Sequence, residues 1–412
     1  MTLPKATDIL IAEALQMRVY LDYNATTPVD PAVFQAMAPF FTASFGNAGS
    51  IHSAGQRARA AVDAARESVA ALVGAKASEI VFTSGGTEAD NLAILGTVSR
   101  MAPSLESSRK RRHVITSAIE HHAVLNTCQE LERLGVEVTY AHGGPSGIID
   151  PEEVRRALRD ETVLITVMHA NNELGTLQPI EEIGKIAKDA GVIFHCDAVQ
   201  SAGKVRLDVE RLGVDLLSIS AHKIYGPKGT GALYVRSGTS IEPLLHGGHA
   251  ERDRRPGTEN VPGIVGMGKA AELAREQLNG DAVRVKALRD RLQAALLEQI
   301  PAARVNGDPI RRVWNTINIT FPGAGGEALV IALDLQGVEC STGAACSSGA
   351  VEPSHVLTAI GLSDDEARSS LRLSLGRPTT EAEIEEAIRV IPGVVARLRA
   401  LSPHVATEAP AR

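Results

Sequence analysis

Lys223 is the residue whose surroundings most strongly suggest chemistry. It follows the mostly apolar residues 214–220, which predict a buried strand, and it precedes Gly226 and Pro227, which stop any helix. A lysine held at a strand end can form a Schiff base with a carbonyl cofactor, and partial desolvation favours its neutral, nucleophilic amine. The same pattern also fits an ordinary surface lysine with a buried stem.

An aspartate ends a second predicted strand. Residues 192–197 are compact and mostly apolar up to Asp197, and Gln200 follows three positions later. A carboxylate at this place can keep a pyridine ring nitrogen protonated, which pyridoxal phosphate needs in order to act as an electron sink. An aspartate that caps a helix after a strand would give the same spacing.

A glycine turn supplies a third feature. Residues 79–83 predict a strand, Ser84 to Gly86 predict a turn, and residues 88–94 predict a helix. Gly86 and Thr87 are therefore candidates for binding a phosphate, because free backbone N–H groups and the helix dipole favour an anion there. Glycine turns between strands and helices also occur for purely conformational reasons.

These motifs lie in an order that resembles the cysteine desulfurases, and most closely their nitrogen-fixation and iron–sulfur-assembly type. Those proteins are pyridoxal-phosphate enzymes of the aminotransferase class V family. The resemblance covers nearly the whole chain and is carried by residues 20–28, 45–47, 83–88, 120–122, 171–175, 220–229, 255–260, 345–349 and 373–377.

The resemblance implies an α/β fold, the PLP-dependent transferase fold type I. We expect a large PLP-binding domain with a mostly parallel seven-stranded sheet at residues 21–262. A smaller α+β C-terminal domain would comprise residues 1–20 and 263–412. The smaller domain would carry a mobile cysteine loop at about residues 340–354.

The resemblance also assigns roles to matching positions. The residues that would bind pyridoxal 5'-phosphate are Gly86, Thr87, His121, Asn172, Asp197, Gln200, Ser220, His222, Lys223 and, from the partner subunit of a homodimer, Thr258. Lys223 would hold the cofactor covalently, His121 would stack on its ring, and Asp197 would pair with the ring nitrogen. Gln200 would bond the ring hydroxyl, and Gly86, Thr87, Ser220, His222 and Thr258 would bind the phosphate. Asn172 and Arg377 would orient the substrate, with Arg377 gripping its carboxylate through both guanidinium arms.

Cys346 would define the reaction. Small residues surround it on both sides, which is typical of an exposed, mobile segment, although a free cysteine is more often a buried packing residue. The resemblance implies that L-cysteine is converted to L-alanine and that its sulfur passes to Cys346 as a persulfide. Because the thiolate is the reactive form, a group such as His121 should accept the thiol proton, and Lys223 is the natural base for the α-proton. Cys340 is interpreted as a packing residue, with a sulfur relay or a disulfide to Cys346 as the alternative.

Other functions remain open at this point. A selenocysteine lyase or a class V transaminase on the same fold would need no sulfur-accepting thiol. A non-catalytic scaffold for sulfur-carrier partners would keep the fold without the chemistry. A metal site is disfavoured, because neither the run His195 to Asp197 nor the pair His246 and His249 has further ligands at the spacings of zinc sites.

Composition agrees with an enzyme of two domains. The chain has 412 residues and 44% hydrophobic content, and its net charge of −7 argues against general nucleic-acid binding. Its four cysteines contain no CxxC pair, its first residues lack a signal peptide, and no apolar stretch is long enough for a membrane span. We expect a cytoplasmic homodimer that delivers sulfur to an iron–sulfur scaffold, with nitrogenase assembly as one option, or to another acceptor protein.

Two local patterns carry further expectations. Residues 261–279 and 282–299 predict two helices, and residues 381–398 predict a last helix with a kink or break at Pro392. The loop before Thr258 departs from the family pattern at Ala250, Asp253 and Pro256. We expect Thr258 to reach the neighbouring phosphate despite these changes.

Overall fold

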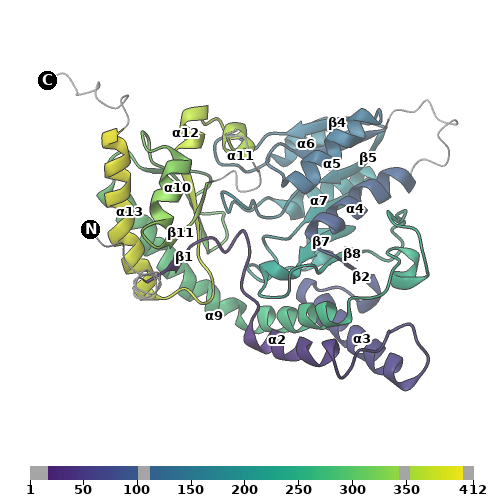
Figure 1. Ribbon diagram of the computed structural model, residues 1–412. Coiled ribbons are helices and arrows are strands. Elements are labelled where there is room, and N and C mark those ends of the chain that lie inside the picture. The colour runs from purple at the N-terminus through teal and green to yellow at the C-terminus, as the bar shows by residue number, and fades with distance from the viewer. Residues whose placement is uncertain (1–16, 101–111, 343–352, 402–412) are drawn as a thin grey trace.

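A seven-stranded sheet forms the centre of the larger half of the molecule (Figure 1). The computed structural model describes residues 17–100, 112–342 and 353–401. The strand order is β2-β8-β7-β6-β5-β3-β4, and neighbours are parallel except that β8 runs antiparallel to β2 and β7. The strands are β2 (Ile80–Thr83), β3 (His113–Ser117), β4 (Glu137–Ala141), β5 (Thr162–Thr166), β6 (Ile193–Asp197), β7 (Leu216–Ser220) and β8 (Gly231–Val235). This sheet confirms the predicted α/β class.

Both faces of this sheet are covered, which explains why its strands are apolar runs without alternation. Ile80 and Phe82 pack in the largest hydrophobic core, whereas Val81 between them packs in a separate cluster on the other face. The helices of this half are α2 (Pro31–Met37), η1 (Ala38–Phe41), α3 (Ser53–Val73), η2 (Ala77–Glu79), α4 (Gly86–Arg100), α5 (His122–Arg133), α6 (Pro151–Ala157), α7 (Ile180–Ala190), α8 (Val209–Leu212), η3 (Ala221–Lys223) and η4 (Ala250–Asp253).

A second core lies beside the first and is built on an antiparallel sheet of order β12-β13-β10-β9. A short parallel pair, β1 with β11, brings the start of the described chain to this half. The remaining elements are β1 (Val19–Tyr20), β9 (Arg304–Val305), β10 (Thr316–Thr320), α10 (Gly326–Asp334), β11 (Val338–Glu339), β12 (Ser341–Thr342), α11 (His355–Ala359), α12 (Asp364–Arg368), β13 (Ser370–Ser374) and α13 (Glu381–Leu401).

One long helix, α9 (Val261–Gln299), belongs to both cores and runs along the base of the molecule in Figure 1. Ala270 in its first half packs in the larger core, and Leu292 in its second half packs in the smaller one. The expectation of two helices here is wrong. Gly280 weakens a helix by only about 1 kcal/mol, and burial of both flanking halves outweighs that cost. The helix α13 likewise continues through Pro392.

The two halves of α9 pack in different cores, and this affects where the domain boundary lies. Residues of α9 up to Ala274 pack with the larger core, whereas Leu21 near the start of the chain packs with the smaller one. We therefore propose that the division falls within α9, near Gly280, in place of the predicted limit at residue 262.

Candidate active site

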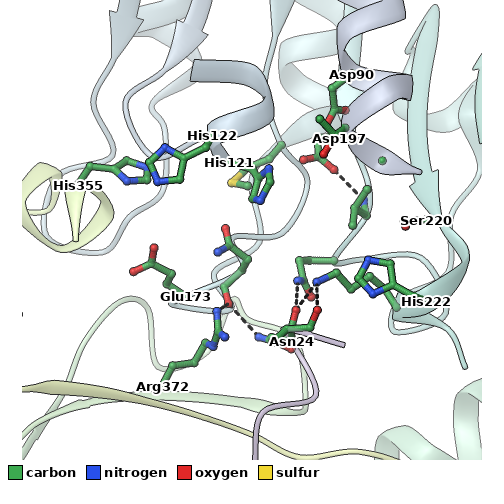
Figure 2. A pocket seen from close by; sticks show the side chains of 18 residues that line it. Asn24, Asp90, His121, His122, Glu173, Asp197, Ser220, His222, His355 and Arg372 are labelled. Atoms are coloured by element: carbon green, nitrogen blue, oxygen red, sulfur yellow. Dashed lines mark hydrogen bonds between the residues drawn. The ribbon is translucent and has the colours of Figure 1, made fainter. Parts of the chain in front are cut away.

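A cavity of about 400 Å³ lies at the carboxyl edge of the large sheet (Figure 2). The segments that follow β2, β3, β5, β6 and β7 all contribute to its wall. These strands run in one direction, so their carboxyl ends meet at a single edge, where open α/β sheets bind their ligands. Asn24, His355 and Arg372 close the cavity from the smaller half.

Most of the predicted cofactor residues meet at this cavity. Those that line it are Gly86, Thr87, His121, Asn172, Asp197, Gln200, Ser220, His222 and Lys223. Thr258 and Arg377 do not line it. Cys346 lies outside the residues that the structure describes.

Lys223 ends the short helix η3 directly after β7. Its Nζ donates hydrogen bonds to the backbone oxygens of Asn24, at 2.5 Å, and Ala25, at 2.8 Å. Tyr225, two residues later, has a φ of 66°, so the chain turns sharply away from the cavity after the lysine. The strand end and this turn together hold the amine in the cavity wall, and it is not a surface lysine.

Asp197 ends β6 and is almost completely buried. Its Oδ1 accepts a hydrogen bond from the backbone N–H of Val199 at 2.8 Å, and burial raises the pKa of Asp197 to about 6. Asp90 lies beside it in the wall, as Figure 2 shows, and burial and the charge of Asp197 raise the pKa of Asp90 well above its ordinary value. Two buried carboxyl groups at one place favour a positively charged ligand group.

His121 has two functions in the structure. Its Nδ1 accepts the backbone N–H of Ala123 at 3.1 Å and so caps the N-terminus of α5, while its ring lines the cavity. Burial, together with Lys223, lowers the pKa of His121 to about 4, so the ring is neutral at pH 7. Since Nδ1 accepts, the ring proton lies on Nε2, and this nitrogen donates rather than accepts.

The N-terminus of α4 forms one end of the cavity. The helix begins at Gly86, and a Cβ at this position would meet Cγ2 of Val199 at 2.7 Å, whereas a Cβ on Gly85 would meet nothing within 4 Å. Only glycine leaves the backbone at residue 86 open beside Ser220. The first-turn N–H groups there can therefore receive an anion such as a phosphate.

These observations fit pyridoxal phosphate. The helix start at Gly86 suits its phosphate, the carboxyl of Asp197 suits its ring nitrogen, and Lys223 suits its aldehyde. The Oδ1 of Asn172 is also buried at the cavity without a hydrogen-bond partner among the described residues. A bound ligand can supply the hydrogen-bond donor that this buried oxygen lacks.

Arg377, which is predicted to orient the substrate, does not line this cavity. Its guanidinium pairs with Asp281, at 3.0 Å, and Asp30, at 3.3 Å, and stacks over the ring of Tyr225. Arg372 lies in the cavity wall instead, with 2% of its side chain exposed. Arg372 donates to Asp22 at 2.7 Å, and its Nε has no partner within the described chain.

Further residues of the site were missed by the sequence reasoning. Glu173 lines the cavity, its carboxylate accepts the hydroxyl of Ser354 at 2.5 Å, and burial raises its pKa to about 7. The rings of His122 and His355 stand 4.7 Å apart at the cavity edge. Glu173 and His122 lie inside two of the motifs that carry the resemblance, residues 171–175 and 120–122, but no role was assigned to them there. No local signal marks His355.

The loop before α9 holds an unusual backbone. Glu251, Arg252 and Asp253 have φ angles of 48°, 56° and 64°, a conformation that favours glycine. The Glu251 carboxylate compensates: it forms a buried ion pair with Arg66 at 2.7 Å and accepts the N–H of Phe82 at 2.9 Å. Thr258 is exposed on the segment that follows. Its reach to a partner's phosphate stays a prediction.

Residues 17–100, 112–342 and 353–401 contain no group of three or more histidine, cysteine, aspartate or glutamate side chains placed to hold a metal ion. Within the same ranges, every helix is too short or too polar to cross a membrane.

The sheet and the cavity at its carboxyl edge define an α/β fold with a ligand site in the position usual for open α/β sheets. The chain belongs to the family described as Aminotransferase class-V, whose sequence pattern matches residues 19–387. Enzymes of this family depend in general on pyridoxal phosphate.

The chain is similar over nearly its whole length to several named proteins. The chain is 48% identical over 390 residues to "Cysteine desulfurase IscS" of Dictyoglomus turgidum, covering 95% of this chain and 98% of that protein. It is 51% identical over 391 residues to a cysteine desulfurase of Trichormus azollae, covering 95% and 96%. A solved structure titled "NIFS-LIKE PROTEIN" has a TM-score of 0.85 and 38% identity, covering 92% of this chain and 100% of the other.

Proposed function

We propose that this protein is a pyridoxal-phosphate-dependent cysteine desulfurase. It converts L-cysteine to L-alanine and takes the sulfur on Cys346 as a persulfide, for delivery to iron–sulfur cluster assembly. The observation that carries the proposal is the placement of Lys223, Asp197 and the N-terminus of α4 around one cavity. The relatives named cysteine desulfurase, at about half identity over nearly the whole chain, support the choice of reaction.

The cofactor would be held by the residues that line the cavity. Lys223 would bind its aldehyde, Asp197 would keep a negative charge at the ring nitrogen, and Gly86 and Thr87 would hold the phosphate through α4. When bound, pyridoxal phosphate supplies an electron sink that weakens bonds at the carbons of the amino acid. The ring of His121 would lie against the cofactor as a neutral surface.

The substrate would be oriented from the smaller half. We propose that Arg372 takes the role predicted for Arg377, because Arg372 lines the cavity and its Nε, which has no partner among the described residues, can bind a carboxylate. Nζ of Lys223, which contacts two backbone carbonyls, would move the proton of the substrate α-carbon. The neutral His121 would donate a hydrogen bond from Nε2, so another group should accept the proton of the Cys346 thiol.

We also propose a cellular compartment, an oligomeric state and a sulfur acceptor. Cys128 and Cys196 are buried free thiols, which supports a reducing compartment such as the cytoplasm. A homodimer would let Thr258, exposed on the loop before α9, reach the phosphate site of the partner subunit. The sulfur acceptor would be an iron–sulfur scaffold, of nitrogenase or of general assembly, or another carrier protein.

The proposal is tested by incubating the purified protein with L-cysteine and mapping the persulfide by mass spectrometry while measuring alanine. The native protein should give alanine and a persulfide on Cys346. Lys223→Ala should lower alanine formation by about 10²–10⁴-fold, because it removes both the cofactor link and the base. Cys346→Ala should keep the cofactor absorption band but lose turnover.

Cys340→Ala is the matched control, because Cys340 packs against the smaller core and does not line the cavity. It should retain both products. Undiminished turnover by Cys346→Ala would contradict the desulfurase and favour a lyase or a transaminase. Absence of a cofactor absorption band in the native protein would favour a scaffold without catalysis.

A further inference from the structure

Lys204 is a second lysine buried next to the site, and none of the roles proposed above uses it. The residue is 8% exposed. Its Nζ donates to Oε1 of Gln200 at 2.8 Å and lies 3.5 Å from Oδ1 of Asn24, so both contacts are to neutral amide oxygens. A buried amine without a carboxylate contact is costly to keep charged, which calls for a functional explanation.

The contacts with Lys204 and Asn24 determine which way the Gln200 amide faces. Gln200 is almost completely buried; its Oε1 accepts from Lys204, and its Nε2 donates to the backbone oxygen of Asn24 at 2.9 Å. The two ends of an amide have nearly the same shape, so hydrogen-bond partners decide their orientation. An ammonium group can only donate and a backbone carbonyl can only accept, so Lys204 and Asn24 together keep the oxygen of Gln200 toward Lys204 and its NH₂ group toward Asn24.

Asn24 connects this arrangement to Lys223. Its backbone oxygen accepts from both Gln200 Nε2 and Lys223 Nζ, and its Oδ1 accepts from Asn315 at 3.0 Å. The buried Lys204 and the half-buried Lys223 therefore belong to one hydrogen-bonded chain that runs through Gln200 and Asn24. A change at one end can alter the other without any direct contact.

The charges around Lys204 are predominantly positive. Burial, then Lys223, then Arg372 lower the pKa of Lys204 to about 7. The small cavity that it shares with Lys223 is also lined by the titratable or charged residues Tyr23, Tyr225, Asp281 and Arg377. The single carboxylate in that set, Asp281, is paired with Arg377. A proton on Lys204 therefore opposes a second positive charge nearby.

We infer that Lys204 is a positioning residue for the link between Lys223 and the cofactor: it fixes the Gln200 amide and opposes a proton on that link. The inference rests on the proposed function. The linking nitrogen gains a proton at low pH and loses it at high pH, and the absorption of the bound cofactor changes with it. Lys204 lowers the pH at which this change occurs.

The test is a pH titration of cofactor absorbance in the purified holoenzyme. Lys204→Met removes the charge and the donor, so the midpoint should rise by about one pH unit. Lys204→Arg keeps a permanent charge and its donors, so its midpoint should equal or fall below that of the native enzyme. Lys185→Met, an exposed change on α7, should leave the midpoint unchanged.

A double-mutant cycle separates positioning from general packing. If Lys204 acts through Gln200, the shifts caused by Lys204→Met and Gln200→Ala should not add in the double variant. An unmoved midpoint in Lys204→Met overturns the inference, even where the melting temperature falls, because a structural role alone would affect only stability. Lys204→Gln replaces Lys204→Met if the latter does not fold. A native protein that shows no cofactor band at all overturns the proposed function and this inference together.

Discussion

The residues on the two sides of the cavity are brought into place in different ways. On the sheet side, Gly86, Asp197 and Lys223 each follow a strand directly, so a short stretch of sequence places them. On the other side, Arg372 meets Asp22 across 350 positions of sequence, and Asn24 contacts Asn172 across 148. Local motifs therefore specify the cofactor wall, whereas packing of the smaller core specifies the substrate wall.

The sharpest test of this difference compares the two arginines. Arg372→Ala should lower kcat/KM for L-cysteine by about 10²-fold, because two charge-assisted hydrogen bonds to a carboxylate contribute roughly 3 kcal/mol. Arg377→Ala should cost less than about tenfold, although it should lower the melting temperature by breaking ion pairs with Asp30 and Asp281. Steady-state kinetics of both variants decides. A larger kinetic loss in Arg377→Ala would return the substrate role to the residue that the sequence predicts.

A second test concerns the cofactor wall and has a matched control next to it in the chain. Gly86→Ala should weaken cofactor binding by about 10- to 100-fold, because overpacking against Val199 costs about 1–3 kcal/mol. Gly85→Ala adds the same methyl group where nothing lies within 4 Å, so its affinity should stay near that of the native protein. Equilibrium titration of the apoprotein with pyridoxal phosphate measures both. Equal losses in the two variants would contradict the tight contact at Gly86.

The smallest expected effect is on stability. Burial raises the pKa of Glu120 to about 8 from an ordinary value of 4.5, so the folded protein holds a proton there that the unfolded chain releases. The free energy of unfolding should therefore fall as pH rises between 4.5 and 8, with a contribution of up to about 1.4 kcal/mol per pH unit. Glu120→Gln cannot ionise and should flatten this fall by up to about 2 kcal/mol between pH 6.5 and 8.

Urea unfolding at several pH values measures this change. The window above pH 6.5 avoids the titration of His121 and His195, whose lowered pKa values act with the opposite sign at lower pH. Glu67→Gln, an exposed change on α3, is the control and should follow the native curve. Parallel curves for the native protein and Glu120→Gln would show that the buried carboxyl does not take up a proton on folding.

Much of the sheet and of the cofactor wall could be predicted from the sequence. Apolar runs that end in a polar residue, as at Asp197 and Ser220, give both the strand and the place of its last side chain. The continuity of α9 could not be predicted, because Asn279 and Gly280 weaken a helix locally while burial in two separate cores maintains it. Arg372 was missed because β13 puts it in the cavity only after pairing with β10.

The unbroken course of α9 has a mechanical consequence. At 1.5 Å per residue, its 39 residues form a continuous helix of roughly 58 Å. Its two ends pack in different halves of the molecule. Hinge bending between those halves would break backbone hydrogen bonds in the middle of α9. Relative motion of the two halves should therefore leave α9 intact and proceed by small shear movements of packed elements rather than by hinge bending.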